Sequence, residues 1–199
     1  MYKEDDTVIV AASRTAIGSF NGVFINTPTY KLGSAVIKSL LEKSNLDPLD
    51  VDEIILGQIL TAGQGQNPAR QAAVDAGVPY EKPSWLINQL CASGLRAVIL
   101  AHQQIFENNN KIMIAGGQEN MSMTPHTTAI RNGKKMGDIT LSDSMINDAL
   151  IDFFNNYHMG ITAENVAQQW KIDRKTQDNF AYQSQLKASK AQESGRFDE

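Results

Sequence analysis

Cys91 is the residue of this chain best suited to covalent chemistry, and it is the only cysteine among 199 residues. It lies between the apolar segment 85–90 and a segment of helical spacing that starts at Ala92. In the first turn of a helix, free backbone N–H groups and the positive end of the helix dipole favour a reactive thiolate. The same N–H groups can stabilise a developing oxyanion. The alternative is a buried structural cysteine, and position alone does not decide between the two.

The three histidines are the other candidates for acid–base or metal chemistry. His102, His126 and His158 lack the spacing of a metal site, and one cysteine cannot complete a structural zinc site. We therefore expect no metal. His102 falls on the inward face of a predicted helix, which favours a packed core residue. His158 lies at the mouth of an irregular segment, where the sequence allows either a pocket residue or a packed one.

The glycine-rich loop 63–67 is a weak candidate for phosphate binding. Its sequence, GQGQN, lacks the Gly-Lys-Ser/Thr ending of a phosphate-binding loop and the six-residue dinucleotide fingerprint. A tight turn between a strand and a helix is the favoured interpretation.

Charge and hydropathy exclude several partners. Lys and Arg number 18 and Asp and Glu number 22, which gives a net charge of -4 with both signs mixed along the chain. Nucleic-acid binding needs a concentrated basic surface, so we expect no nucleic-acid partner. No apolar stretch approaches the roughly 20 residues of a membrane span, and segment 1–6 lacks the apolar core of a signal peptide. With a single cysteine, these features predict a reduced, soluble, cytoplasmic protein without a membrane partner.

The first 117 residues alternate short apolar runs with segments of helical period. This pattern predicts an α/β fold, with a mixed, mainly parallel sheet and helices on both faces. The predicted strands are 7–12, 53–60, the segment leading into Cys91, and 111–115.

Helix starts follow from capping residues. Thr27 is expected as an N-cap with Pro28 at the first helical position, and Asn67 with Pro68 repeats this pattern. A third helix follows Cys91 and is expected to end at the asparagines 108–110. Its predicted inward face consists of Leu95, Val98, Ile99, His102 and Ile105.

After Gly117 the pattern changes. Segment 118–160 has no long periodic run, which is typical of an irregular excursion that serves as a binding loop or lid. Thr162 is expected to begin a helix to about Trp170, and Asp173 to cap a last helix followed by Gly195. The predicted divisions are an α/β core at 1–117, a loop domain at 118–160, and helices at 161–199 that return toward the core.

Three motifs, in one order, resemble the signatures of the thiolase family. They are NQLCASGL at 88–95, AGGQENMS at 115–122 and YHMGITAEN at 157–165. Shorter similarities at 14–18, 63–70 and 177–181 extend the resemblance over nearly the whole chain. His158 and Met159 match the short-chain, acetyl-transferring branch of the family. Ala92 departs from the pattern, because the family usually has glycine there, and its methyl group would crowd the acyl group slightly.

The resemblance implies acetyl-CoA C-acetyltransferase chemistry. The thiolate of Cys91 would attack acetyl-CoA, and the enolate of a second acetyl-CoA would attack the acetyl-enzyme to give acetoacetyl-CoA; the reverse is thiolysis. The backbone N–H of Cys91 would contribute to an oxyanion hole. His158 and Met159 would line the pantetheine and acyl pocket, and Leu150 would contact the adenine end of CoA. No cofactor is implied, because the CoA thioesters are substrates.

The resemblance also implies a longer protein. Family members are roughly twice this length, and their second α/β half supplies an activating histidine, a second cysteine and an asparagine. We therefore expect this chain to be the N-terminal half of a thiolase that needs a C-terminal partner half. Each acid–base group contributes about 10²- to 10⁴-fold, so we expect the chain alone to be essentially inactive. The loop domain would cover CoA and help to hold a homotetramer together.

Two alternatives stay open. The chain could be a non-catalytic thiolase remnant whose exposed sheet face favours aggregation. It could also be a ketosynthase-like condensing enzyme, which uses a cysteine at a similar turn, although the motifs at 119–122 and 158–160 argue against this hypothesis.

Overall fold

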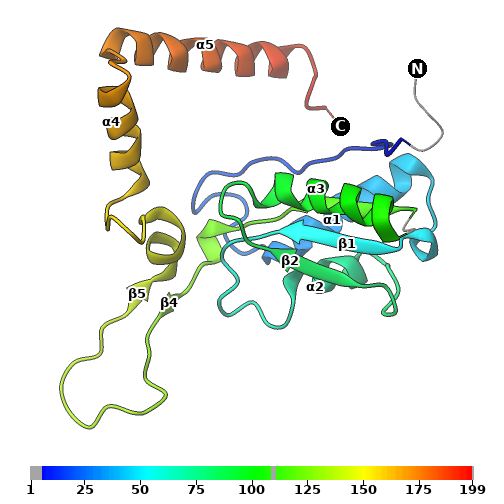
Figure 1. Ribbon diagram of the computed structural model, residues 1–199, viewed down its shortest axis with the longest axis horizontal. Helices are drawn as coiled ribbons and strands as arrows, with labels where there is room; N and C mark the ends of the chain where they lie inside the picture. The colour runs from blue at the N-terminus through cyan, green and yellow to red at the C-terminus, as the bar shows by residue number, and fades with distance from the viewer. Residues whose placement is uncertain (1–5, 109–110, 199) are drawn as a thin grey trace. The chain divides into compact units, whose positions relative to one another are not determined.

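The computed structural model describes residues 6–108 and 111–198. Contacts divide the chain into two compact units, Met1–Ala149 and Leu150–Glu199. The first unit confirms the α/β prediction, with a mainly parallel sheet and helices on both of its faces (Figure 1). The predicted division into a core at 1–117, a loop domain at 118–160 and helices at 161–199 stays a prediction.

A three-stranded parallel sheet forms the centre of the first unit. β1 (Glu53–Gly57) lies in the middle, between β2 (Ser84–Ile87) and β3 (Met113–Gly117). The register pairs Gly57 with both Ile87 and Gly117, so the three strands end together. The loops that follow them therefore share the carboxyl edge of the sheet, which is where α/β proteins bind ligands.

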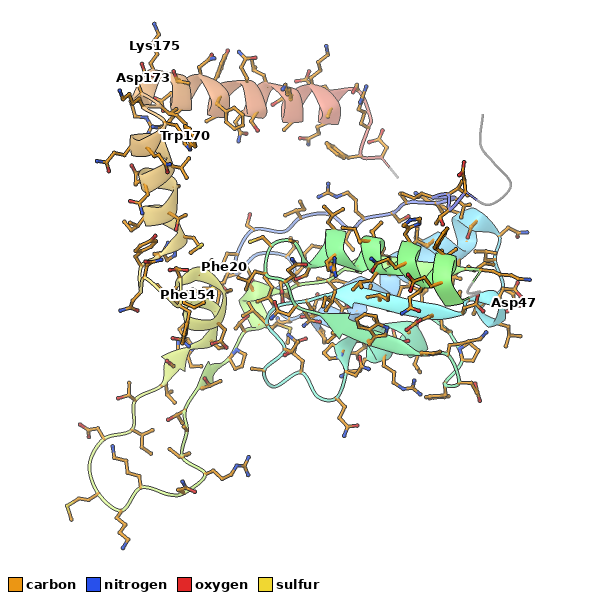
Figure 2. The ribbon with its side chains drawn as sticks, in the orientation of Figure 1. Phe20, Asp47, Phe154, Trp170, Asp173 and Lys175 are labelled. Carbon is orange, nitrogen blue, oxygen red and sulfur yellow. The ribbon has the colours of Figure 1, made fainter. Side chains whose placement is uncertain are left out.

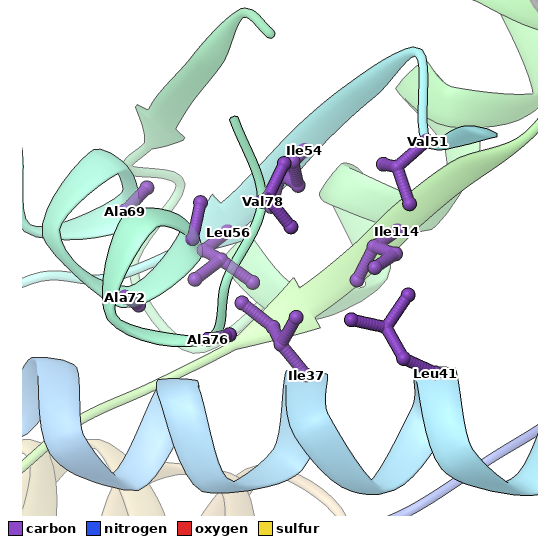
Figure 3. Packing of buried hydrophobic residues seen from close by; sticks show 11 residues of the cluster. Ile37, Leu41, Val51, Ile54, Leu56, Ala69, Ala72, Ala76, Val78 and Ile114 are labelled. Carbon is purple, nitrogen blue, oxygen red and sulfur yellow. The ribbon is translucent and has the colours of Figure 1, made fainter. Parts of the chain in front are cut away.

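Side chains of β1 alternate between the two faces of the sheet. Ile54 and Leu56 pack into the larger hydrophobic cluster, with Ile37 of α1 (Thr29–Ser44) and Ala72 of α2 (Pro68–Asp75) (Figure 3). This face holds the tightest packing, since Ile37, Ile54 and Ala72 are almost completely buried.

The opposite face of the sheet packs against α3 (Ser93–Asn108). Ile55 contacts a smaller cluster that contains Ala97 and Ala101. The period of two along β1 therefore places helices on both faces, as a strand that is covered on both sides requires.

The predicted inward face of α3 is wrong. Ala97 and Ala101 are buried, whereas Leu95 is 67% exposed and His102 is also exposed. Small side chains let the helix approach the sheet closely, so the larger residues of the predicted face point elsewhere. His102 is therefore not the packed core residue that was expected. The predicted end of α3 lies partly at 109 and 110, outside the described residues.

The predicted strand at 7–12 is also wrong. In the structure this segment has no regular secondary structure, and Ile9 and Val10 are 81% and 75% exposed. The segment, β3, α1 and α3 line one apolar cavity of about 650 Å³. A strand is stable only when its backbone groups pair with a neighbour. Among the described residues no strand pairs with 7–12, so its apolar sequence alone does not produce a strand.

Several boundaries differ from the predictions. Pro28, not Thr27, is the N-cap of α1. β1 ends at Gly57, before the predicted end at 60, and β3 begins at Met113, two residues late, and includes both glycines. Asn67 does cap α2, accepting a hydrogen bond from the Arg70 N–H at 3.1 Å.

The end of the first unit is irregular, as predicted for the segment after Gly117. It contains a short 3-10 helix, η2 (Met121–Met123), and a two-stranded hairpin of β4 (His126–Thr127) and β5 (Ser142–Asp143). A single π-helical turn, η3 (Ile146–Leu150), follows and spans the boundary between the units.

The second unit consists mainly of two helices, α4 (Met159–Gln169) and α5 (Arg174–Glu193). α4 begins three residues before the predicted Thr162, while Asp173 caps α5 as predicted and Gly195 follows it with a φ of 70°. Figure 2 labels Trp170 and Asp173 where α4 passes into α5. Among the described residues 150–198, none is buried.

Candidate active site

Cys91 lies on the turn between β2 and α3, at the carboxyl edge of the sheet. Its side chain is exposed, so the alternative of a buried structural cysteine is wrong. α3 begins at Ser93, two residues after Cys91, and the thiol therefore precedes the first helical turn instead of lying within it. A reagent can reach this thiol directly.

The turn has an unusual backbone. Leu90 has a φ of 48°, in the left-handed region that bulky residues rarely adopt. Such a conformation costs about 1–3 kcal/mol and persists only where surrounding contacts enforce it. Its N–H donates to Asn88 Oδ1 at 2.9 Å, and its carbonyl accepts from the Ser93 hydroxyl at 2.6 Å. Leu90 is thus held from both sides, directly before Cys91.

Glycines let the start of α3 sit on the end of the sheet. A Cβ atom added to Gly57 would lie 2.5 Å from the Ser93 carbonyl carbon and 2.6 Å from the Gly94 nitrogen. Both atoms are backbone, so a side-chain rotation could not relieve the clash. A Cβ on Gly117 would in turn lie 3.1 Å from the Gly57 carbonyl oxygen. This close packing therefore fixes the distance between the start of α3, next to Cys91, and the end of β1.

A partly buried carboxyl group, that of Glu119, lies two residues after the end of β3. Glu119 Oε2 accepts hydrogen bonds from the N–H groups of Ile59, at 2.8 Å, and Leu60, at 3.4 Å. Burial raises the pKa of the Glu119 carboxyl, although these hydrogen bonds oppose the shift. Glu119 thus joins the loop after β1 to the segment after β3.

Amide side chains connect the same loops. Gln118 Nε2 donates to Gln58 Oε1 at 2.9 Å, and Gln58 Nε2 donates to Gln64 Oε1 at 2.8 Å. Gly63 and Gly65 have φ values of 71° and 81°, so this loop is a tight turn that needs glycine, as its sequence suggested. The carboxyl edge is therefore braced by polar side chains.

The predicted CoA-contact residues lie in or at the start of the second unit. His158 is the N-cap of α4, and its Nδ1 accepts a hydrogen bond from the Gly160 N–H at 3.0 Å. This contact leaves Nε2 to carry the proton of the neutral ring. Met159 is the first residue of α4 and is 38% exposed.

The structure brings these three residues onto neighbouring segments. Leu150 is the last residue of η3 and is partly buried. The next residue, Ile151, forms an antiparallel bridge with His158. Leu150, His158 and Met159 therefore belong to one local arrangement within the second unit, whereas Cys91 belongs to the first.

The described residues contain neither a cluster of metal ligands nor a helix suited to a membrane. Nowhere in 6–108 and 111–198 do three His, Cys, Asp or Glu side chains gather as metal ligands. Over the same residues, no helix is long and apolar enough to span a membrane.

Sequence reasoning missed two residues of the site. Ser93 and Glu119 both lie inside recognised motifs, but the motifs do not say what their side chains bind. For Ser93 a signal existed, because serine at a helix start commonly bonds to nearby backbone. For Glu119 the spacing gave no signal, since its partners lie 59 and 60 residues away.

Fold and site together define an α/β domain with an exposed cysteine at the ligand-binding edge of a parallel sheet. Residues 7–199 match the family model described as "Thiolase, N-terminal domain". The chain belongs to the thiolase family.

Several relatives are similar to this chain over nearly all of its length. An acetyl-CoA acetyltransferase of Rhizobium meliloti (strain 1021) is 57% identical over 190 residues, which cover 96% of this chain and 48% of the relative. The cytosolic acetyl-CoA acetyltransferase of Mus musculus is 52% identical, over 98% of this chain and 49% of the relative. A probable acetyl-CoA acyltransferase of Staphylococcus epidermidis (strain ATCC 12228 / FDA PCI 1200) is 55% identical, over 96% and 49%. The chain therefore spans about half the length of these relatives.

Proposed function

We propose that this chain is the N-terminal half of an acetyl-CoA C-acetyltransferase and that Cys91 is its acyl-accepting nucleophile. The observation that carries the proposal is the exposed thiol at the carboxyl edge of the sheet, in a chain whose relatives are named acetyl-CoA acetyltransferases. Acetyl-CoA and acetoacetyl-CoA are the proposed substrates, and no cofactor takes part.

The reaction proceeds in two steps. The Cys91 thiolate attacks the carbonyl carbon of acetyl-CoA, the bond from that carbon to the CoA sulfur breaks, and CoA leaves as a thiolate that takes up a proton. The α-carbon of a second acetyl-CoA, after loss of a proton, then attacks the acetyl-cysteine, forming the carbon–carbon bond and releasing the Cys91 thiolate. The covalent thioester divides one difficult step into two easier ones.

The backbone around Cys91 is suited to the first step. Its N–H is part of the rigid turn before α3, and such a fixed donor can stabilise the negative oxygen of the tetrahedral intermediate. In the second unit, the exposed Met159 and the Nε2 of His158 are the proposed contacts for the pantetheine arm and acyl group, with Leu150 toward the adenine.

The groups that accept and deliver protons are proposed to lie in a C-terminal half. The chain spans about half of its relatives. His102 lies in α3 nine residues after Ser93, so it is roughly 13 Å along the helix from the Cys91 turn. The chain alone is therefore proposed to be essentially inactive, and to act when joined to that half. Assembly as a homotetramer and a cytoplasmic location belong to the same proposal; the Mus musculus relative is named cytosolic.

Fusion to a C-terminal half tests the proposal. The chain would be joined to the part of the Rhizobium meliloti relative that lies beyond the aligned region, and thiolysis of acetoacetyl-CoA would be measured. We expect activity in the fusion and its loss, by at least about 10³-fold, in Cys91→Ser. Ser84→Ala serves as the matched control, because Ser84 is buried in β2 and its Oγ has no hydrogen-bond partner among the described residues.

Mass spectrometry gives a second readout. Incubation of the fusion with acetyl-CoA should add one acetyl group, and digestion should place it on the peptide that contains Cys91. A soluble, folded fusion that neither cleaves acetoacetyl-CoA nor becomes acetylated would refute the proposed function.

A further inference from the structure

The side chain of Ser93 closes the turn that carries Cys91. Its Oγ accepts a hydrogen bond from the Gln89 N–H at 2.8 Å and donates one to the Leu90 carbonyl at 2.6 Å. One hydroxyl group thus joins the residues on the strand side of the cysteine to the first residue of α3. Cys91 lies inside this closed loop of five residues.

The turn needs such a constraint. Leu90 has a left-handed backbone, which a leucine leaves readily for an extended or right-handed one unless contacts hold it. Among the described residues, the Asn88 side chain also forms a hydrogen bond to the Leu90 backbone, but Asn88 is itself exposed, whereas Ser93 is only 4% exposed. The hydrogen bonds of the Ser93 hydroxyl are partly buried and compete less with water, so Ser93 is the stronger of the two constraints.

Ser93 is in turn fixed by the sheet. Gly57, at the end of β1, lies so close to it that an added Cβ would be 2.7 Å from the Ser93 Cβ. The position of Ser93 is therefore set by the strand ends. Its two hydroxyl hydrogen bonds then fix the backbone on either side of Cys91, together with backbone bonds from the Ala92 N–H to the Gln89 carbonyl and from the Ser93 N–H to the Leu90 carbonyl.

We propose that Ser93 is a positioning residue for the acyl-transfer reaction: it holds the Gln89–Ser93 turn so that the Cys91 thiol and backbone N–H face the substrate carbonyl together. The inference rests on the proposed function, in which Cys91 is the nucleophile. Ser93 does not touch the substrate and acts only through the geometry of the turn. Misplacement of a reacting group by about 1 Å can cost about 10²-fold in rate.

Substitution in the fusion enzyme separates positioning from stability. Ser93→Ala removes the hydroxyl and should lower kcat for thiolysis about 10- to 100-fold, while KM stays within about twofold because no substrate contact is lost. Ser84→Ala removes a buried serine hydroxyl of the same size that has no hydrogen-bond partner among the described residues, and it should leave kcat unchanged. Ser93→Thr retains an Oγ and should recover most of the rate.

Amide hydrogen exchange reports on the turn directly. In Ser93→Ala the Gln89 N–H loses its acceptor, so its exchange should accelerate by at least about fivefold. Exchange along β1 should change no more than it does in Ser84→Ala. This readout is available both in the fusion and in the 199-residue chain, and it still decides the proposal if the added methyl group unfolds Ser93→Thr.

Two results would overturn the inference. One is Gln89 exchange in Ser93→Ala that matches Ser84→Ala. The other is a loss of activity that only follows the amount of folded protein and is not reversed by Ser93→Thr. Failure of the proposed function looks different, because the unsubstituted fusion would then neither cleave acetoacetyl-CoA nor become acetylated. The Gln89 exchange would still show whether Ser93 holds the turn.

Discussion

The two units of the chain are stabilised by different interactions. In the first, helices cover both faces of a parallel sheet, and eleven buried residues form the larger of two hydrophobic clusters (Figure 3). In the second, none of the described residues 150–198 is buried, although α5 is the longest helix that the structure describes. The second unit therefore depends on local contacts such as caps and neighbouring side chains on one helix.

This difference shows which of the predicted site residues lie on a rigid part of the molecule. Cys91 lies on a turn in the first unit that is fixed by close backbone packing and partly buried hydrogen bonds. The proposed CoA contacts lie on a unit without a core of its own, where helices are stabilised mainly by local interactions and are marginal in isolation. In the proposed reaction, the thioester would therefore meet one group on a rigid turn and others on helices that are stabilised only locally.

The largest expected effect tests the core of the first unit. Ile54 is completely buried, so Ile54→Ala should lower the free energy of unfolding by about 2–5 kcal/mol. Ile161→Ala makes the same deletion in α4, where the side chain is 49% exposed, and should cost less than about 0.5 kcal/mol. Urea unfolding measures both. Equal losses would mean that the second unit has a core after all, and the comparison would fail.

The next effect tests the close packing beneath Cys91. In Gly57→Ala the new Cβ meets backbone atoms at 2.5 Å and 2.6 Å, so we expect a loss of about 1–3 kcal/mol. Gly116→Ala is the matched control, because an added Cβ there would have no atom within 4 Å. If both substitutions shift the urea midpoint equally, steric contact with α3 is not the reason that Gly57 is glycine.

The sequence predicted the parts of the first unit that local patterns determine. Short-range spacing predicts the strand that begins at 53, the strand before Cys91 and the strand that ends at Gly117. It also predicts the helix caps Asn67 and Asp173. Segment 7–12 and the buried face of α3 were predicted incorrectly for a shared reason: both depend on which element lies opposite. The apolar sequence of 7–12 cannot say whether a pairing strand is present, and the spacing in α3 cannot show that alanines fit closest to the sheet.

The candidate site divides in the same way. Cys91 could be predicted as the nucleophile from its motif and its place next to a helix; the structure shows that its side chain is exposed, and its role stays a prediction. The hydrogen bonds of Ser93 and the burial of Glu119 could not be recognised, because they depend on the backbone path and on residues far away in the chain. No sequence pattern gave the left-handed conformation of Leu90, since leucine has no preference for it.

Two acidic residues of the first unit should respond to pH with opposite sign. Hydrogen bonds from the Ile112 and Lys111 N–H groups lower the pKa of Asp52, so its contribution is present above the ordinary carboxyl range near 4 and is lost as pH falls through the lowered pKa. Burial raises the pKa of Glu119, so the folded state loses stability as pH rises from the ordinary range through the raised pKa.

Neutral isosteres measure these contributions. Asp52→Asn should cost about 1 kcal/mol at pH 7, a value limited by the partial exposure of Asp52, and the cost should shrink toward about pH 3. Glu119→Gln should gain stability relative to the unsubstituted chain as pH rises from about 4 to about 7. Urea midpoints across this range give both curves. Parallel curves for the two variants would show that burial does not govern Glu119.

The smallest effect concerns the second unit alone. Asp173 Oδ1 accepts from the Thr176 N–H at 2.7 Å at the start of α5, and the side chain and backbone of Thr176 lower the pKa of Asp173 (Figure 2). Asp173→Ala should reduce the helical circular dichroism signal and speed amide exchange over the first turns of α5, because an N-cap is lost. Acidification below the ordinary range near 4 should do the same to the unsubstituted chain.

Lys175→Ala, which removes an exposed side chain from the same turn without removing a cap, should leave helicity unchanged or slightly higher, since alanine favours helix. Because α5 contributes no buried residue, the urea midpoint of the first unit should not move in Asp173→Ala. A shift of that midpoint would show that the two units unfold as one, and the local account of α5 would have to be abandoned.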